Sequence, residues 1–286
     1  MAAHAYIPVD LDDLATFLRQ LPREEPLLMV GLGSNLLIRD GGFKGTVVFT
    51  HNALKAMHLE RDPSPFPLPP FQAVIYVEAG VASPKLSRFA ATHGLGGAEF
   101  FAGIPGTIGG ALAMNAGCHG SQTWERVDRV LMLNRRGKRI ERSATDFQIA
   151  YRHVDWPAME DEVFVAAWLR FSAGEPLSIR QRIKLLLQRR IDTQPLQWPN
   201  AGSVFRNPPN DHAARLIEAA GLKGLSAGGA RVSEKHANFI VNPDGRATAS
   251  EIETLIGQVQ ATVREKFGVE LVREVRIIGE KFGDER

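Results

Sequence analysis

One cysteine, Cys118, and no strong excess of either charge mark this chain of 286 residues. A single thiol excludes a disulfide framework and any metal or iron–sulfur site built from several cysteines, and it indicates a reducing compartment. The 8 histidines form no metal-binding spacing such as His-Glu-x-x-His, so we expect no metal site. The 34 basic residues almost balance the 32 acidic ones, which argues against nucleic acid as a partner.

Long apolar runs and a secretory signal are also missing. Residues 100–118 carry no formal charge, but five glycines, a proline and an asparagine interrupt this stretch. A membrane-spanning helix is more uniformly apolar, and the N-terminal sequence MAAHAYIPVD lacks the basic and apolar segments of a signal peptide. We therefore expect a cytoplasmic globular protein with no membrane partner, built at this length from two or three domains.

Apolar periodicity predicts an α+β chain rather than the regular alternation of a doubly wound parallel sheet. Expected helices cover residues 9–20, 84–93, 178–191, 211–220 and 247–267. Expected strands cover residues 26–31, 46–50, 73–80, 129–133, 162–171, 238–242 and 269–279. Asp10 is the expected cap of the first helix. The basic helix 178–191 is expected to bury Ile179, Ile183, Leu186 and Leu187 on one face.

These elements group into units at residues 1–58, 70–175 and 185–268, followed by a C-terminal strand within 269–286. Residues 62–70, DPSPFPLPP, are typical of a short extended linker because proline stiffens the chain. The proline-rich segment 193–209 is expected to be a domain boundary or an ordered crossing loop.

Two glycine-rich segments predict a site for an anion. The first contains Gly31, Gly33, Ser34 and Asn35, directly after a buried strand, where closely spaced glycines let backbone N–H groups turn toward a phosphate. It lacks the third glycine of the dinucleotide-binding fingerprint and the Gly-Lys-Ser/Thr of a P-loop. A tight turn between two strands is the alternative interpretation.

The second glycine-rich segment, residues 103–117, has almost no bulky polar side chains, and Pro105 stiffens one of its turns. Such a segment lets a pyrophosphate and an extended cofactor chain lie against bare backbone. The alternative is a glycine-rich helix packed closely against a sheet. Its expected cofactor-binding residues are Gly103, Gly106, Thr107, Gly109, Gly110, Asn115 and Gly117.

Three side chains are candidates for catalysis, each with an ordinary alternative. Arg152 offers a planar fork for a carboxylate or phosphate, unless it is a plain surface arginine. Ser203 lies in a tight glycine turn that differs from the Gly-x-Ser-x-Gly elbow of hydrolases, and it could simply cap backbone groups. Glu274 lies between two arginines on an expected strand, where a salt-bridged glutamate is the alternative. The charged quartet 233–236 is most simply a solvated turn.

The order of these segments is more specific than any one of them. GLGSNLL, AGIPGTIGGALAMNAG, YR, NAGSVFRNP, GGARVSEKHANFIVN and EVRIIG follow one another along the chain. This order resembles the UDP-N-acetylenolpyruvoylglucosamine reductase (MurB) family, over residues 7–279. The second glycine segment and the NAGSVF turn are specific to that family. The absence of a long insertion after YR, together with SEKHANF, looks like its shorter second subtype.

The resemblance implies a flavin-binding domain of the vanillyl-alcohol-oxidase type in two parts, plus a smaller α+β substrate domain. It implies FAD and NADPH as cofactors and two hydride steps that produce UDP-N-acetylmuramate for peptidoglycan. Arg152, Ser203 and Glu274 match the family's catalytic positions. We expect a nucleotide-sugar substrate to contact Tyr151, Arg189, Arg190 and Asn207, with at least one of the two neighbouring arginines facing its diphosphate. A monomer is expected.

The chain departs from the family's pattern in two places. Family members normally begin with a further segment that holds a threonine, an arginine and a Gly-Gly pair, so the first flavin-binding part is expected to be short here. A serine usually follows the tyrosine–arginine pair, whereas here His153 and Val154 follow it. Two other functions stay open: a flavin oxidoreductase of the same cofactor fold that acts on a small alcohol or sugar, and a non-catalytic protein that binds a nucleotide sugar.

Overall fold

The computed structural model describes residues 2–60, 72–159 and 161–283. The chain forms two compact units. The large unit comprises His4–Leu32 and Gly45–Gln188, and the small unit comprises Met1–Ala3, Gly33–Lys44 and Arg189–Arg286. The small unit therefore takes residues 33–44 from within the segment 1–58 that the sequence suggested as one piece. The expected linker at residues 62–70 lies outside the described residues.

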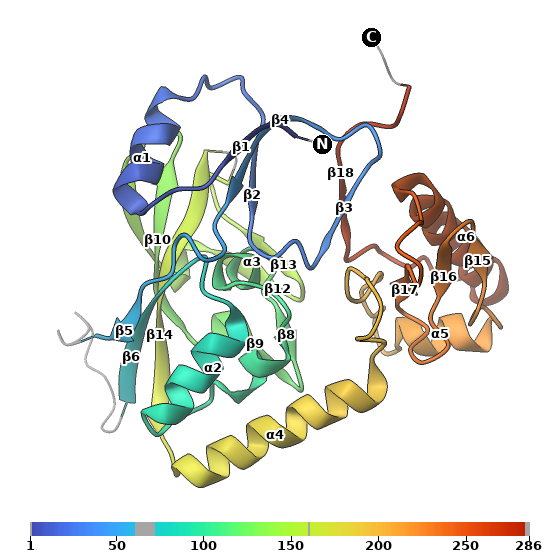
Figure 1. The fold of residues 1–286 in the computed structure, drawn as a ribbon. Helices are drawn as coiled ribbons and strands as arrows, with labels where there is room; N and C mark the ends of the chain where they lie inside the picture. The colour runs from blue at the N-terminus through green and yellow to red at the C-terminus, as the bar shows by residue number, and fades with distance from the viewer. Residues whose placement is uncertain (1, 61–71, 160, 284–286) are drawn as a thin grey trace. The chain divides into compact units, whose positions relative to one another are not determined.

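A six-stranded sheet forms the centre of the large unit, with strand order β11-β10-β14-β6-β5 and with β7 paired to β14 (Figure 1). Its strands are β5 (Met57–Leu59), β6 (Gln72–Glu78), β7 (Leu95–Gly96), β10 (Val127–Asn134), β11 (Arg139–Ser143) and β14 (Glu162–Ala173). These strands pair antiparallel. The expectation of an α+β chain rather than a doubly wound parallel sheet is confirmed.

Most of the long helix α4 (Pro176–Thr193) belongs to the large unit. The unit's other helices are α1 (Leu11–Gln20), α2 (Ser83–Thr92) and α3 (Ile108–Ala113), with 3-10 turns η1 (Glu99–Gly103), η2 (Thr123–Glu125) and η3 (Ala144–Asp146). Its small strand pairs are β8 (Gly117–Cys118) with β9 (Ser121–Gln122), and β12 (Gln148–Ala150) with β13 (His153–Asp155). The Asp10 carboxylate accepts a hydrogen bond from the Asp13 N–H and caps α1, as expected.

A three-stranded sheet with order β1-β4-β2 contains β1 (Ala2–Tyr6), β2 (Leu27–Val30) and β4 (Phe43–Phe49). No strand was expected at the residues of β1. Four of its five residues are exposed, so it lacks the apolar alternation that reveals a strand in sequence.

Both faces of the six-stranded sheet are buried. Successive residues of a strand point to opposite faces, so neighbouring residues belong to different cores. On β10, Val130 and Met132 belong to the core that α2 and α3 cover. Leu131 and Leu133 belong to a second core, which α1 covers. This two-sided burial explains the continuous apolar run of the strand.

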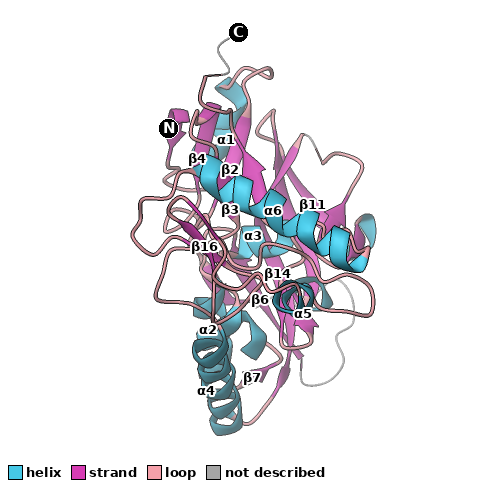
Figure 2. Cartoon of the chain, turned by 90° about the vertical axis from the view of Figure 1, so that its right-hand side faces the viewer, coloured by secondary structure: helices cyan, strands magenta, loops and turns pink. Residues whose placement is uncertain are grey.

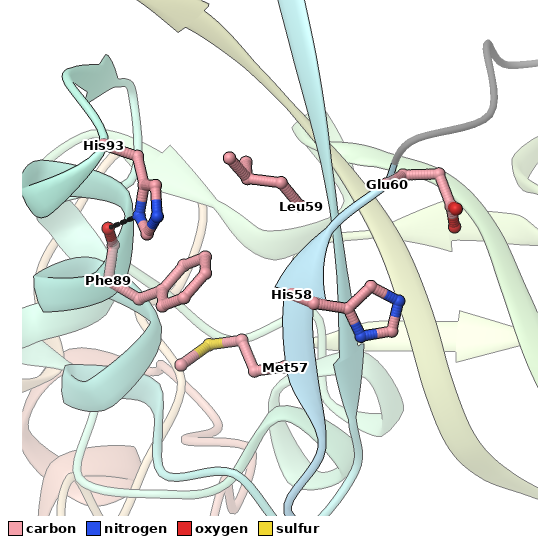
Figure 3. A pocket seen from close by; sticks show the side chains of 6 residues that line it. All are labelled: Met57, His58, Leu59, Glu60, Phe89 and His93. Atoms are coloured by element: carbon pink, nitrogen blue, oxygen red, sulfur yellow. Dashed lines mark hydrogen bonds between the residues drawn. The ribbon is translucent and has the colours of Figure 1, made fainter.

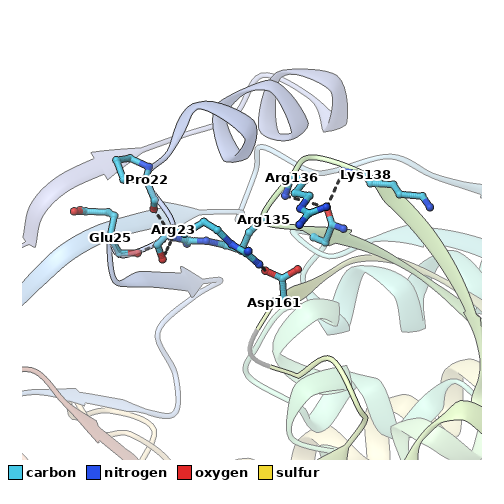
Figure 4. Close-up of polar contacts among 8 residues, drawn as sticks. Pro22, Arg23, Glu25, Arg135, Arg136, Lys138 and Asp161 are labelled. Atoms are coloured by element: carbon cyan, nitrogen blue, oxygen red, sulfur yellow. Dashed lines mark hydrogen bonds and ion pairs between the residues drawn. The ribbon is translucent and has the colours of Figure 1, made fainter.

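Arg135, at the end of β10, connects the β10–β11 hairpin to the loop before β2 (Figure 4). One of its guanidinium nitrogens donates to the carbonyl oxygens of Pro22, Arg23 and Glu25 at 2.9, 3.2 and 2.7 Å. Arg23 also contacts Asp161 at 3.1 Å. A charged donor thus satisfies carbonyl groups that the loop itself leaves without strand partners.

The small unit consists of short strands and two helices around its own apolar core. Its strands are β3 (Leu36–Ile38), β15 (Ser226–Ala227), β16 (Ala230–Val232), β17 (Ile240–Val241) and β18 (Arg276–Ile278), and its helices are α5 (Ala213–Ala219) and α6 (Ala249–Phe267). β3 pairs parallel with β18, and β15, β16 and β17 form a second sheet. Figure 2 shows α6 as the long helix of this unit.

α4 (Pro176–Thr193) is the expected basic helix, extended by two residues at each end. Its expected apolar face is wrong: Ile179 is buried, but Leu187 is 37% exposed and Ile183 and Leu186 are only half-buried. Ile179 packs near Gly174, where a Cβ would lie 3.0 Å from its Cδ1. The strand expected over residues 269–279 is also shorter and covers only Arg276–Ile278. Among the described residues, no helix is long and apolar enough to cross a membrane.

Candidate active site

The two glycine-rich segments meet in the large unit. A Cβ on Gly31 would lie 2.1 Å from the side-chain oxygen of Thr107, so no other residue fits at position 31 without a shift. Thr107 is 2% exposed and immediately precedes α3. The structure therefore brings together two of the predicted cofactor positions that lie far apart in the sequence.

Gly109 and Gly110, near the start of α3, differ in how much space surrounds them. The Gly109 N–H donates to the Ala79 carbonyl oxygen at 2.9 Å, and a Cβ on Gly109 would lie 2.9 Å from the Ala79 Cβ. A Cβ on Gly110 would meet only the Thr107 oxygen, at 3.9 Å, and Gly110 is exposed. The alternative interpretation, a glycine helix packed on a sheet, thus accounts for Gly109 but leaves Gly110 unexplained by packing.

The remaining glycines of this segment lie close to other residues of the large unit. A Cβ on Gly103 would lie 2.8 Å from the Cys118 sulfur, and one on Gly117 would lie 2.4 Å from the Ser121 carbonyl oxygen. The Gly106 carbonyl oxygen accepts a hydrogen bond from the Ser83 N–H at 2.9 Å. Close approach of backbone explains the lack of side chains at positions 103 and 117.

Asn115 and Arg152 join the glycine segment to the β12–β13 hairpin. Asn115 is fully buried with φ of 42°, and its side-chain amide donates to the carbonyl oxygen of Ala150 at 3.0 Å. Its side-chain oxygen accepts from the Trp124 N–H at 3.2 Å. Arg152, at φ of 56°, donates from its guanidinium to the Asn115 and Gly117 carbonyl oxygens at 3.3 and 2.8 Å. These bonds orient the Arg152 fork, so it is not a plain surface arginine.

Ser203 and Glu274 lie in adjacent extended segments of the small unit. Gly202, at φ of 75°, forms the turn before Ser203, and its N–H donates to the Asn200 side-chain oxygen at 3.0 Å. The Glu274 N–H donates to the carbonyl oxygen of Val204 at 2.8 Å. The residue that follows Ser203 is therefore bonded directly to Glu274.

The end of the first glycine segment belongs to the same region of the small unit. The Asn35 side-chain amide donates to the Glu274 carbonyl oxygen at 3.1 Å. A Cβ on Gly202 would lie 3.8 Å from the Ser34 carbonyl oxygen. Gly33, at φ of 67°, provides the left-handed turn that leads into these residues. Ser34, Asn35, Ser203 and Glu274 are thus brought together, although 239 residues separate Asn35 from Glu274.

The expected substrate residues come from both units. Arg189 is exposed near the end of α4, and the Arg190 guanidinium donates to the Gln194 side-chain oxygen at 3.0 Å. The Asn207 side-chain oxygen accepts from the Ala213 N–H at 3.1 Å, which caps the first turn of α5. Tyr151 is 47% exposed, and its ring centre lies 4.9 Å from the Arg152 guanidinium carbon.

Asn238 is a residue of this region that the sequence analysis passed over. It is 3% exposed, its side-chain amide donates to the Phe205 carbonyl oxygen at 2.8 Å, and its side-chain oxygen accepts from the Phe205 N–H at 3.0 Å. The Asn238 carbonyl oxygen accepts from the Val204 N–H at 2.9 Å. An asparagine inside the quoted SEKHANF segment was the available signal.

The turn at residues 233–236 exposes Glu234 and Lys235, as expected, but hydrogen bonds hold it in shape. The Ser233 hydroxyl accepts hydrogen bonds from the N–H groups of Lys235 and His236, at 3.1 and 3.3 Å. The His236 Nδ1 accepts from the Asn238 N–H at 3.3 Å. Burial lowers the pKa of His236 below its ordinary value of 6.5, which favours this neutral form.

A hollow of about 760 Å³ lies between β5 and α2 of the large unit (Figure 3). Its lining consists of Met57, His58, Leu59, Glu60, Phe89 and His93. The Glu60 carboxylate accepts from the Trp168 indole N–H at 2.6 Å, and His58 stacks on Tyr76. None of the predicted site residues lines this hollow. A smaller, largely apolar cavity of about 150 Å³ in the small unit includes Val204 and Val275, beside Ser203 and Glu274.

Comparison with known proteins identifies both parts of the chain. Residues 2–143 match the FAD-binding domain family, and residues 194–278 match the C-terminal domain of UDP-N-acetylenolpyruvoylglucosamine reductase. The UDP-N-acetylenolpyruvoylglucosamine reductase of Thiobacillus denitrificans is 54% identical over 98% of this chain and 87% of its own length. The chain belongs to the UDP-N-acetylenolpyruvoylglucosamine reductase family.

Other members of this reductase family agree. The enzyme of that name from Legionella pneumophila strain Corby is 55% identical over 98% of this chain and 87% of its own length. The crystal structure of the reductase from Thermus caldophilus superposes with a TM-score of 0.76 and 28% identity, and it covers 96% of this chain and 91% of that one. The expected flavin-binding fold with an additional α+β domain is therefore confirmed.

Proposed function

We propose that this chain reduces the enolpyruvyl group of UDP-N-acetylglucosamine enolpyruvate to UDP-N-acetylmuramate, with FAD and NADPH, in the synthesis of peptidoglycan precursors. The observation that carries the proposal is the match over 98% of this chain to a reductase of this name, with Ser203 and Glu274 held in adjacent segments. Arg152, in the large unit, is the third proposed catalytic residue.

The described residues fit a flavin nucleotide. Gly110 leaves open space at the start of α3 where any side chain would stand, and no packing within the protein explains it. Gly31, Gly33, Ser34, Asn35 and the segment 103–117 are the residues that would hold the cofactor. When bound, FAD would supply a hydride, taken from NADPH, to the outer carbon of the substrate's alkene.

Arg152 is proposed to stabilise the charge that develops next. Hydride addition to the outer carbon leaves negative charge on the neighbouring carbon, and this charge spreads into the adjacent carboxylate as an enolate. A planar guanidinium binds such a group through two parallel N–H donors. The bonds from Arg152 to the carbonyl oxygens of Asn115 and Gly117 hold the guanidinium in place before the reaction.

Ser203 is proposed to protonate the enolate carbon, which completes the reduction. A serine hydroxyl is a weak acid, but an enolate carbon is basic enough to take its proton when the hydroxyl is well placed. Glu274, next to Val204, is proposed to hold the polar network of this site or to supply its proton. Tyr151, Arg189, Arg190 and Asn207 are the proposed substrate contacts.

One preparation tests this function against its alternatives. Purified protein should be yellow, and NADPH should bleach the flavin absorbance until the enolpyruvyl sugar nucleotide is added. Turnover of NADPH with that substrate supports the reductase. A yellow protein that the substrate leaves reduced indicates another flavin oxidoreductase, and a colourless protein that binds the sugar nucleotide indicates the non-catalytic alternative. Sedimentation would test the proposed monomer, and cell fractionation the proposed cytoplasmic location.

A further inference from the structure

Glu274 lies where the C-terminal segment changes its pairing partner. Just before it, Arg273 forms an antiparallel bridge with Phe205. Just after it, Arg276 begins the parallel pairing of β18 with β3 at Leu36. Glu274 itself belongs to neither ladder. The regular pattern of sheet hydrogen bonds therefore changes at Glu274.

Both main-chain polar groups of Glu274 are nevertheless bound. Its N–H donates to the Val204 carbonyl oxygen at 2.8 Å, and its carbonyl oxygen accepts from the Asn35 side-chain amide at 3.1 Å. The Asn35 carbonyl oxygen also accepts from the Arg276 N–H at 3.0 Å. Asn35 thus binds the segment at Glu274 through its side chain and at Arg276 through its carbonyl oxygen. The side-chain bond belongs neither to the Phe205–Arg273 bridge nor to the β3–β18 pairing.

The same turn borders the segment that carries Ser203. The Ser34 carbonyl oxygen lies 3.8 Å from the position that a Cβ on Gly202 would take. The 33–35 turn therefore packs beside the glycine turn on one side and holds the Glu274 peptide on the other. A shift of this turn would move the surroundings of both proposed catalytic side chains.

We propose that Asn35 is a positioning residue for Glu274, in addition to belonging to a cofactor-binding loop. Its side-chain amide fixes the Glu274 peptide and so directs the carboxyl group for the step in which the substrate takes up its proton. The inference rests on the proposed function, in which Glu274 serves that second half-reaction. Sequence alone suggested only that Asn35 is a donor to an anion.

The test separates the two half-reactions in the holoenzyme. Asn35→Asp keeps the size of the side chain but replaces its N–H donor by an acceptor that repels the Glu274 carbonyl oxygen. By rapid mixing, reoxidation of the reduced flavin by the enolpyruvyl sugar nucleotide should slow by roughly tenfold or more, the factor expected for one lost hydrogen bond. Reduction by NADPH should change by less than about threefold.

A second readout needs no turnover. Hydrogen exchange of the Glu274 and Arg276 amides should quicken by roughly tenfold in Asn35→Asp and Asn35→Ala, because the segment loses the bond that holds it. Gln260→Ala is the matched control, since the Gln260 side-chain amide donates to the Leu271 carbonyl oxygen of the same segment at 2.8 Å. It removes the same kind of bond three residues away and should leave the ratio of the two half-reaction rates unchanged.

The outcomes decide the proposal. Equal slowing of both half-reactions, with loss of bound flavin and normal exchange at Glu274, would show that Asn35 serves only the cofactor. Unchanged exchange and unchanged reoxidation would also overturn the proposal. If the wild-type flavin is not reoxidised by the sugar nucleotide, the proposed function fails instead, and the exchange experiment still decides whether Asn35 holds Glu274.

Discussion

The large and small units hold their site residues by different means. In the large unit, β10 and β14 are 8 and 12 residues long, and the glycine segments pack closely against neighbouring residues, as Gly109 does against Ala79 and Gly117 against Ser121. In the small unit, no described strand exceeds three residues, and side-chain amides of asparagine supply the bonds around Ser203 and Glu274. Short strands leave many backbone groups unpaired, and asparagine, with two donors and an acceptor, satisfies them.

This comparison explains which residue types to expect at each site. A glycine is required where backbone approaches backbone, as at Gly109 beside Ala79. An asparagine is required where one residue must satisfy both the N–H and the carbonyl of another, as Asn238 does for Phe205. In the large unit, Asn115 likewise satisfies buried backbone groups through its side-chain amide, here the carbonyl of Ala150 in the β12–β13 hairpin and the N–H of Trp124.

The largest effect is expected at Ser203. Ser203→Ala should slow reoxidation of the flavin by substrate by at least about 10²-fold, because a positioned general acid contributes about 10²–10⁴-fold. Reduction by NADPH should be nearly normal, since no substrate proton moves in that half. Rapid mixing measures both rates. Ser226→Ala, at an exposed serine of β15, serves as the control, and near-normal reoxidation in Ser203→Ala would remove Ser203 from the mechanism.

The two glycines of α3 should respond differently to valine. Gly110→Val should fold but take up at least tenfold less FAD, because the new side chain fills the open space where the cofactor is proposed to lie. Gly109→Val should unfold at a lower temperature, since its Cβ overlaps the Ala79 Cβ, and overpacking costs about 1–3 kcal/mol. Flavin absorbance and thermal unfolding report the two effects. Full flavin occupancy in a folded Gly110→Val variant would contradict the cofactor assignment.

Asn238 and Asn115 allow a direct comparison of the units. Asn238→Ala leaves the Phe205 N–H and carbonyl buried without this partner and should cost about 1–3 kcal/mol in the free energy of unfolding. It should also slow reoxidation, because Phe205 follows the Ser203 turn. Asn115→Ala should lower the free energy of unfolding by a similar amount. Any effect of this variant on catalysis should arise from a displaced Arg152. Urea unfolding with rapid mixing checks both, and an Asn238→Ala variant of normal stability would show that the two hydrogen bonds contribute nothing.

The smallest effect concerns His236 and pH. Burial lowers the pKa of His236 in the folded protein, whereas in the unfolded chain it stays near 6.5. As the pH falls, the unfolded chain therefore takes up this proton before the folded protein does. The free energy of unfolding should therefore fall as the pH drops from about 7 toward the folded pKa. His236→Gln should show a shallower fall over this range than the wild type. The exposed His212→Gln is the control, and identical pH profiles for all three proteins would argue against the assignment.

The sequence predicted the long strands and the capped helices better than the short strands and the exposed helix face. The continuous apolar runs of β10 and β14 predicted strands, because both faces of the sheet are buried. Asp10 predicted the start of α1, which it caps. The expected strand over residues 269–279 and the apolar face of α4 were wrong. Short irregular segments and an exposed helix depend on distant neighbours more than on their own periodicity.

The order of motifs along the chain predicted the family, the cofactor class and the candidate residues Arg152, Ser203 and Glu274. This was possible because glycine loops and turns depend on residues that are neighbours in the sequence. Only the tertiary structure decided that Gly109 is needed for packing while Gly110 is not. It alone showed that Asn35 bonds to Glu274, 239 residues away. A hydrogen bond or a steric clash depends on atoms that the fold brings together, and a single sequence does not record which distant atoms those are.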